Sequence, residues 1–274
     1  MAPLRRRVLP CMIPFFGCAF RRSFALGLLA LFPASLLAAS VPARRKQEPM
    51  RQMLVVKSAD GKVIANGEDS ASADGNRIHS DLVFHFLDGS LDEQITDFTQ
   101  DGDFHLIYDR HVQKGPSFPT PLDLAVDMSS GTVTWHELKA GKDKVYSTHM
   151  ALPEDLANGL VPLLAENVPP GSSGFQVSWI AIAIRPLLVS LTIQPDPGAD
   201  PANDPPHAHR LLLHPELHGM MWAMASAFGK KPADLHFVVS GDPLPSFLRL
   251  VGPFYQGGPV WTVESLGPEM PMTP

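Results

Sequence analysis

Residues 104–112 read Phe-His-Leu-Ile-Tyr-Asp-Arg-His-Val, and this stretch decides the fold that we expect. In a β-strand, successive side chains point to opposite faces. Such a strand would place two sets of side chains on opposite faces: Phe104, Leu106, Tyr108 and Val112 on one, and His105, Asp109 and His111 on the other. One apolar and one polar face are typical of a strand in an antiparallel sheet.

Turn sequences divide the surrounding residues 81–148 into similar short runs. Asp88-Gly89, Asp101-Gly102, Ser130-Gly131 and Gly141 each allow one residue to take a positive φ and fold a strand back on its predecessor. We therefore expect an up-and-down β meander here. The 28 prolines and 21 glycines among the 274 residues also favour many short elements.

The rest of the chain predicts further strands and two helices. The expected strands are a hairpin at 50–65, a strand buried on both faces at 175–184, and shorter strands at 187–193, 209–214, 235–240, 247–251 and 260–265. The expected helices are 152–167, with an apolar stripe of leucines, and 215–230. The small and polar residues of 67–80 predict a loop.

These elements predict an α+β domain, in which a curved antiparallel sheet (a half-barrel or open barrel) holds two helices on its concave face. The expected segments are a signal peptide at 1–43, a first hairpin and flexible loop at 44–80, the main domain at 81–266 and a tail at 267–274.

Residues 1–43 have the pattern of a secretory leader. Five arginines precede an apolar stretch at 24–37, and small residues around Ser40 and Ala43 offer cleavage sites. Arg21-Arg22 also resembles a twin-arginine export signal, so the choice of export route stays open. We expect an exported protein, most simply periplasmic; an uncut leader acting as a membrane anchor is the alternative.

Loss of this leader changes the chemistry that the chain can offer. Both cysteines, Cys11 and Cys18, would be removed, which excludes disulfides and thiolate sites from the mature protein. Five of the 22 basic residues would also be lost, leaving 17 against 28 acidic residues and a formal charge of −11. Such an acidic protein is not expected to bind nucleic acid.

Histidines and aspartates supply the candidate polar sites. His207, His209, His214 and His218 cluster within twelve residues, but no acid or thiol at metal-ligand spacing completes a metal site, so we interpret them as solvated or capping residues. His105, Asp109 and His111 could form an acid/base group on the sheet, although polar residues with this spacing are also typical of a solvated face. Asp101-Gly102-Asp103 fits a hairpin turn better than a calcium loop.

No local motif identifies an enzyme or a cofactor site. The nucleophile elbow, the phosphate loop, the zinc-protease helix and the dinucleotide fingerprint are all absent from the sequence. We therefore predict no cofactor and favour a non-enzymatic protein, while a site assembled from distant residues stays open.

The methionine-rich segment at 215–230 is the most suggestive feature for binding. Flexible thioether side chains beside aromatic rings can adapt to varied apolar ligands. The candidate ligand-contacting residues are Trp179, Met220, Met221, Trp222, Met224 and Phe228. Ordinary packing of this helix against the sheet is the alternative interpretation.

Two segments resemble a known group of proteins. Residues 237–250 (FVVSGDPLPSFLRL) with 257–261 (GGPVW), and residues 109–116 (DRHVQKGP), are similar to an uncharacterised family of exported bacterial proteins of unknown function. The order of meander, apolar helices and closing strands also distantly resembles the lipoprotein-carrier (LolA/LolB-type) half-barrels. That second resemblance implies an acyl chain held in the concavity of the sheet.

Our leading hypothesis is therefore an exported, non-enzymatic protein that binds an apolar or acyl ligand, or a lipidated partner, between sheet and helices. One alternative is a hydrolase-type enzyme with a His/Asp site on the sheet. Another is a structural or assembly component of the envelope, which would expose a sheet edge for a partner protein.

Overall fold

A computed structural model describes residues 41–139, 142–169, 171–182, 185–198, 204–216, 232–241 and 245–272. Most of the expected leader (1–40) and most of the expected second helix (217–230) lie outside these residues. Within them, no helix is long and apolar enough to cross a membrane.

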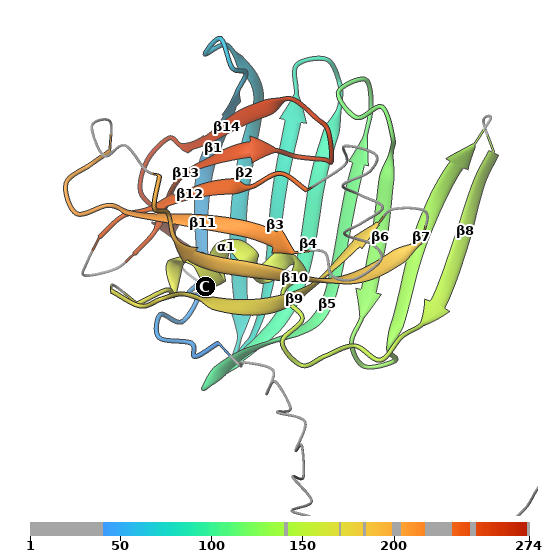
Figure 1. The fold of residues 1–274 in the computed structure, drawn as a ribbon, viewed down its shortest axis with the longest axis horizontal. Helices are drawn as coiled ribbons and strands as arrows, with labels where there is room; N and C mark the ends of the chain where they lie inside the picture. Colours follow the sequence, from blue (N-terminus) through green and yellow to red (C-terminus); the bar gives the residue numbers. More distant parts are fainter. Residues whose placement is uncertain are drawn as a thin grey trace, which may run out of the picture. The chain divides into compact units, whose positions relative to one another are not determined.

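The described chain is built almost entirely from antiparallel strands (Figure 1). The N-terminal strands are β1 (Met50–Lys57), β2 (Val63–Asp74), β3 (Arg77–Phe86), β4 (Leu91–Asp101), β5 (Asp103–Lys114), β6 (Leu122–Asp127), β7 (Thr132–Lys139) and β8 (Lys142–His149). The C-terminal strands are β9 (Phe175–Ile182), β10 (Pro186–Pro195), β11 (His209–Glu216), β12 (Leu235–Val239), β13 (Phe247–Pro253), β14 (Val260–Ser265) and β15 (Met270–Pro271). Between the two sets lie a 3₁₀ turn, η1 (Asn158–Leu160), and one helix, α1 (Val161–Glu166).

Two meanders joined through β1 and β14 form one open sheet. Its order within the described residues is β8-β7-β6-β5-β4-β3-β2-β1-β14-β13-β12-β11-β10-β9, with β15 on β1. The sheet curves, so that the C-terminal strands cross over the N-terminal ones with η1 and α1 between them (Figure 1). Contacts of η1 with β4, β5 and β9, and of α1 with β12, agree with this arrangement.

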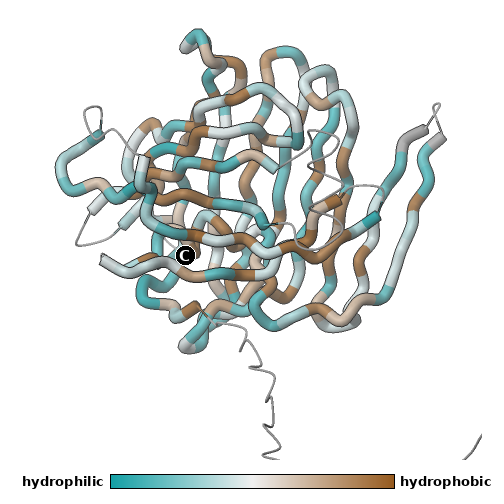
Figure 2. Tube along the Cα trace, in the orientation of Figure 1, coloured by the Kyte–Doolittle hydropathy of each residue, from teal (hydrophilic) through white to brown (hydrophobic). Residues whose placement is uncertain are grey.

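The core lies between the two halves of the curved sheet. Figure 2 shows hydrophobic and hydrophilic residues alternating along many strands, as a sheet with one buried face requires. An aromatic group formed by Phe86, Phe118, Phe254 and Trp261 fills part of the interior, with ring centroids 5.0–6.2 Å apart. The meander expected at 81–148 is confirmed, because each of β3 to β8 pairs with its neighbour in sequence.

The predicted α+β class with two packed helices is wrong. The described elements are nearly all strands of one antiparallel sheet. Their one α-helix spans the six residues Val161–Glu166 instead of the expected range 152–167. Residues 155–157 are not helical because they cover the edge of β9: Ala157 N–H donates to Ser178 O (2.8 Å), and Ser178 N–H donates to Asp155 O (3.2 Å). The predicted leucine stripe is nevertheless buried, at Leu156, Leu160, Leu163 and Leu164.

Two other expectations fail for identifiable reasons. Residues 67–80 are not a loop, because β2 and β3 run through them and turn at Gly75, whose φ is +60°. Ala71 and Ile78 are buried there, at 2% and 0% exposure, so two apolar side chains suffice to hold the polar hairpin. The strand expected at 175–184 was predicted to be buried on both faces, as in the middle of a sheet. Instead, β9 is the last strand of the sheet, and residues 155–158 cover its outer edge.

A β-bulge overturns the simple alternation of residues 104–112. The register between β4 and β5 shifts at Asp97/Phe98, so Ile107 is an extra residue in β5. Phe104 and Leu106 therefore lie on the same interior face as Asp109 and His111, while Tyr108 moves to the outer face with Arg110. An extra residue inverts every side chain that follows it.

Candidate functional site

The bulge brings two of the three predicted acid/base residues into the interior. Asp109 has no exposed surface, and His111 retains 24% side-chain exposure. His105 pairs with Thr99 on the opposite face and takes no part. The interpretation of Asp109 and His111 as a solvated face is therefore wrong.

Asp109 is held by neutral donors and has an unusual environment. Gln94 Nε2 and Thr96 Oγ1 donate to its Oδ1 at 3.0 and 3.2 Å, while Oδ2 has no hydrogen-bond partner among the described residues. Burial raises the pKa of Asp109, and His111, Gln94 and Thr96 oppose that shift only in part. Gly159 of η1 lies against the same carboxyl, since a Cβ there would come within 2.5 Å of Oδ1.

His111 forms the second part of this interior group. Its Nε2 lies 2.9 Å from Asp92 Oδ1, and Gln113 Nε2 donates to Asp92 Oδ2 at 2.8 Å. Burial disfavours the imidazolium, but Asp92 and Asp109 together outweigh burial, and the pKa of His111 is raised. An imidazole oriented by a carboxylate can act as a general acid or base. No hydroxyl among the described residues hydrogen bonds to His111, so the hydrolase alternative stays a prediction.

A small chamber with mixed polar and apolar walls lies between α1 and the inner face of β2–β4. Its volume is about 40 Å³, and its walls include Asp69, Ser80, Gln94, Thr96 and Glu166. That volume corresponds to roughly three waters, at about 10–15 Å³ for each water position. Burial raises the pKa of Asp69 to about 7 and that of Glu166 to about 8, and nearby acids add to both shifts.

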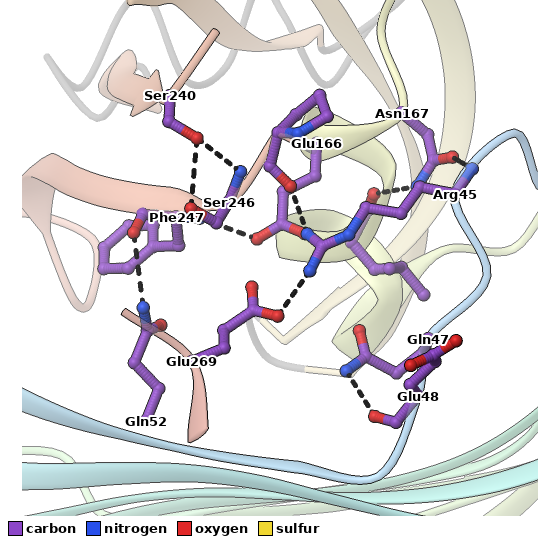
Figure 3. Close-up of polar contacts among 12 residues, drawn as sticks. Arg45, Gln47, Glu48, Gln52, Glu166, Asn167, Ser240, Ser246, Phe247 and Glu269 are labelled. Atoms are coloured by element: carbon purple, nitrogen blue, oxygen red, sulfur yellow. Dashed lines mark hydrogen bonds and ion pairs between the residues drawn. The ribbon is translucent and has the colours of Figure 1, made fainter. Parts of the chain in front are cut away.

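Arg45 connects this chamber to three distant parts of the chain (Figure 3). Its guanidinium donates to Glu166 Oε2 (2.5 Å), to Glu269 and to the carbonyl of Pro245, and its backbone N–H donates to Asn167 Oδ1 at 2.8 Å. Glu166 Oε1 also accepts the N–H of Phe247, at 2.9 Å. We call this group the Arg45 cluster. It fixes the end of α1 against the β12–β13 connection and the C-terminal segment.

A larger pocket opens immediately beyond the Arg45 cluster, where the chain leaves α1. We call it the end pocket; its volume is about 510 Å³. Its apolar walls come from the segment after α1, the end of β10, the loop before β11 and the end of β12: Val168, Pro169, Gly171, Pro195, Pro205, Pro206, Ala208, Leu211 and Val239. Its polar lining residues are Asp196, Asp204, His207, His209 and Arg210.

Most of the charged groups in the end pocket are already held by ion pairs. Asp204, with 5% side-chain exposure, accepts from both Arg210 and Arg249. Asp196 pairs with His236 at 2.7 Å. His207 takes a positive φ of 67°, and its backbone packs so closely on Gly241 that a Cβ there would lie 2.3 Å from His207 O. The loop that carries His207 is thus held in place by its close backbone contact with Gly241.

The structure separates the histidines that cluster in sequence. His207 and His209 line the end pocket, whereas His214 pairs with Asp234 at 2.5 Å, and His218 lies outside the described residues. Across the described ranges, no group of three His, Cys, Asp or Glu side chains is arranged to hold a metal ion. Asp101-Gly102-Asp103 forms a hairpin turn, with Gly102 at a φ of +82°.

The predicted apolar contact residues are placed only in part. Trp179 is half-buried in β9 and packs on the core. Met220, Met221, Trp222, Met224 and Phe228 lie outside the described residues, so their predicted role is untested. Sequence reasoning missed Arg45, Glu166 and the proline-walled end pocket. A signal was present in the sequence at Pro195, Pro205 and Pro206.

Comparisons with known proteins identify no family. No protein-family model matches the chain, and no curated protein matches it. Among solved structures, a beta-barrel-like protein of the domain of unknown function DUF1849 from Brucella abortus is similar, with 10% identity and a TM-score of 0.41. The match covers 81% of this chain and 97% of that one. Similarity at this level carries no argument about function, and the resemblance to lipoprotein carriers stays a prediction.

Proposed function

We propose that this chain is a non-enzymatic binding protein that takes an apolar or acyl ligand into the end pocket. The observation that carries the proposal is the pocket itself. Its volume of about 510 Å³ falls in the range of roughly 300–1,000 Å³ that is usual for small-molecule sites. Nine of its fourteen lining residues are apolar or glycine, which favours a ligand with a largely apolar body.

Proline gives this pocket a stiff wall. Pro169, Pro195, Pro205 and Pro206 each have a fixed φ, so the wall has little conformational freedom to lose when a ligand is bound. The Arg45 cluster adds to this stiffness, because it holds Glu166 and Asn167 just before Val168. A preformed wall of this kind reduces the entropy cost of binding a ligand.

The polar residues suggest how a ligand would be oriented. His207, in the loop before β11, and His209, the first residue of β11, line the pocket, whereas Asp196 and Asp204 are engaged by His236 and by two arginines. A carboxylate or other polar head group would therefore meet imidazole more readily than free carboxylate. An acyl chain with a polar end satisfies both sets of walls.

The size of the chamber between α1 and the sheet favours the end pocket over the site that the sequence suggested, which lay between sheet and helices. The chamber between α1 and β2–β4 has only about 40 Å³, which is room for a few waters and too little for an acyl chain. We therefore place the ligand beyond the end of α1. Export to the periplasm is part of the same proposal and is supported by the leader-like residues 1–43.

A fluorescent fatty acid displaced by unlabelled acyl ligands tests this proposal. Ala208→Trp would fill the end pocket, and Ala73→Trp, on the exposed end of β2, is the matched control. We expect saturable binding by the wild type and by Ala73→Trp, and at least about ten-fold weaker binding by Ala208→Trp. No binding by the wild type, or equal binding by Ala208→Trp, would overturn the proposal.

A further inference from the structure

The edge of the sheet at β8 is exposed along most of its length. β8 ends the strand order, and among the described residues it pairs with β7 alone (Figure 1). Residues 143–147 are exposed in succession, including Val145 at 60% and Tyr146 at 36%. The pairing of β7 and β8 contains no bulge that would turn this edge away from a partner strand.

The backbone of β8 offers a definite set of outward hydrogen-bonding groups. Met150 N–H donates to Gly131 O at 2.9 Å, and alternate residues of an antiparallel pair bond to the same neighbour. Even-numbered residues of β8 therefore bond to β7. Asp143, Val145, Ser147 and His149 direct their N–H and C=O groups outward. An approaching antiparallel strand would meet these four residues.

We propose that this edge pairs with β8 of a second copy of the chain, in an antiparallel register centred on Tyr146. A two-fold axis perpendicular to the sheet places the inner faces of both copies on the same side. Side chains alternate between the two faces along a strand, so each odd-numbered residue must lie opposite an odd-numbered residue of the partner, and each even-numbered residue opposite an even-numbered one. With Tyr146 opposite the partner's Tyr146, Val145 faces the partner's Ser147 and Asp143 faces the partner's His149. All outward backbone groups of residues 143–149 then find partners.

The side chains of β8 suit this register. On the inner face, Tyr146 already stacks on Trp135, with centroids 5.4 Å apart and planes 19° apart. Pairing would place the two Tyr146–Trp135 stacks side by side, and aromatic side chains that lie opposite each other on neighbouring strands stabilise strand pairing. On the outer face, Asp143, which already lies 3.3 Å from His136 Nδ1 of its own chain, gains the partner's His149 as a second imidazole, and this contact occurs twice by symmetry. No residue of β8 faces a like charge, because Lys144 lies opposite the partner's Thr148.

A second copy fits this edge better than an acidic or basic segment of another protein. β8 carries charges of both signs, with Lys142 and Lys144 on either side of Asp143. A purely acidic partner strand would repel Asp143, and a purely basic one would repel the lysines. In contrast, β8 of a second copy, running antiparallel, places the imidazole of its His149 opposite Asp143. This inference concerns the far end of the sheet from β9 and does not depend on the end pocket.

Sedimentation of the full chain tests the pairing. Val145→Pro removes an outward N–H without touching the bonds to β7, and Val145→Thr keeps that N–H as the control. Both copies carry the substitution, so the interface loses two hydrogen bonds by symmetry. We therefore expect the proline variant to dimerise at least about ten-fold more weakly than the wild type. The threonine variant should dimerise normally. A monomeric wild type, or equal dimerisation by Val145→Pro, would overturn the proposal.

Disulfide trapping tests the register without a proline. In a chain with Cys11→Ser and Cys18→Ser, a single cysteine can cross-link only to its copy. Tyr146→Cys places two Cα atoms about 4.5 Å apart in a non-hydrogen-bonded pair, within the range of a disulfide. Lys144→Cys, on the same face, would lie far from its copy. We expect Tyr146→Cys alone to cross-link. Equal cross-linking by both variants, or none by either, would overturn this register.

Discussion

Replacement of Glu166 by glutamine should change how the stability of this protein depends on pH. The Arg45 cluster contains one guanidinium and two carboxyls, with Asp69 nearby. Burial, together with Glu269 and Asp69, raises the pKa of Glu166 from 4.5 to about 8 despite Arg45. The folded protein therefore keeps a proton that the unfolded chain releases above about pH 4.5.

This difference fixes the sign of the effect. A carboxyl whose pKa is raised in the folded state contributes stability below its unfolded pKa, and that contribution is lost as the pH rises toward the folded pKa. Each pH unit in this window costs about 1.4 kcal/mol. Three units, from pH 5 to 8, set an upper limit of about 4 kcal/mol. Because Asp69 and Glu269 interact with Glu166, we expect a loss of about 2–3 kcal/mol.

Glutamine has no proton to release, but it can still accept the N–H of Phe247. Glu166→Gln should therefore be no more stable than the wild type at pH 5, and should gain on it steadily toward pH 8. Urea unfolding at pH 5, 6, 7 and 8 measures this difference, with the exposed Glu154→Gln as control. Parallel pH profiles for wild type and Glu166→Gln would refute the reasoning.

Three further substitutions probe the interior. Arg45→Met should lower the free energy of unfolding by about 2–4 kcal/mol, because it removes the donor to Glu269, to the carboxyl of Glu166 and to the carbonyl of Pro245 and leaves these acceptors unpaired; a loss below about 1 kcal/mol in urea unfolding would contradict this. Gly159→Ala should cost about 1–3 kcal/mol, since its Cβ would lie 1.9 Å from Thr96 Oγ1; Gly267→Ala, with open space around it, should melt like the wild type. Asn158→Ala should cost about 2 kcal/mol, because the Asn158 side chain bonds both the N–H and the C=O of Ile180 on β9; thermal melting within 1 °C of the wild type would argue against that role.

The sequence predicted the strands well, because turn glycines and period-two alternation depend only on neighbouring residues. Gly89, Gly102 and Gly131 all take positive φ in the expected turns, and the strands between them pair in sequence order. Period-two alternation in residues 122–126 also holds, with Leu124 and Val126 buried. These features require no knowledge of distant residues.

Features set by tertiary contacts could not be predicted in the same way. The bulge at Ile107 depends on the register with β4, so the burial of Asp109 and His111 was hidden from a strand-by-strand analysis. The short α1 reflects the use of residues 155–157 to cover the edge of β9, which propensity alone does not reveal. In both cases a partner far along the chain overrides the local pattern.

The candidate site was missed for a similar reason. Arg45 meets Glu166 and Glu269 across separations of 121 and 224 residues, and nothing in the spacing of these residues suggests a cluster. The end pocket joins four segments that are likewise remote in sequence. Proline-rich stretches between short strands are better regarded as possible pocket walls than as loops alone.

Hydrogen exchange of the backbone amides, with and without a medium-chain fatty acid, tests the central claim most directly. If the end pocket holds the ligand, protection should rise at residues 207–211 and at the amides of Val168 and Gly171, while β3 and β4 around the small chamber exchange as before. Protection confined to β2–β4, or no change anywhere at saturating fatty acid, would contradict the assignment of the binding site.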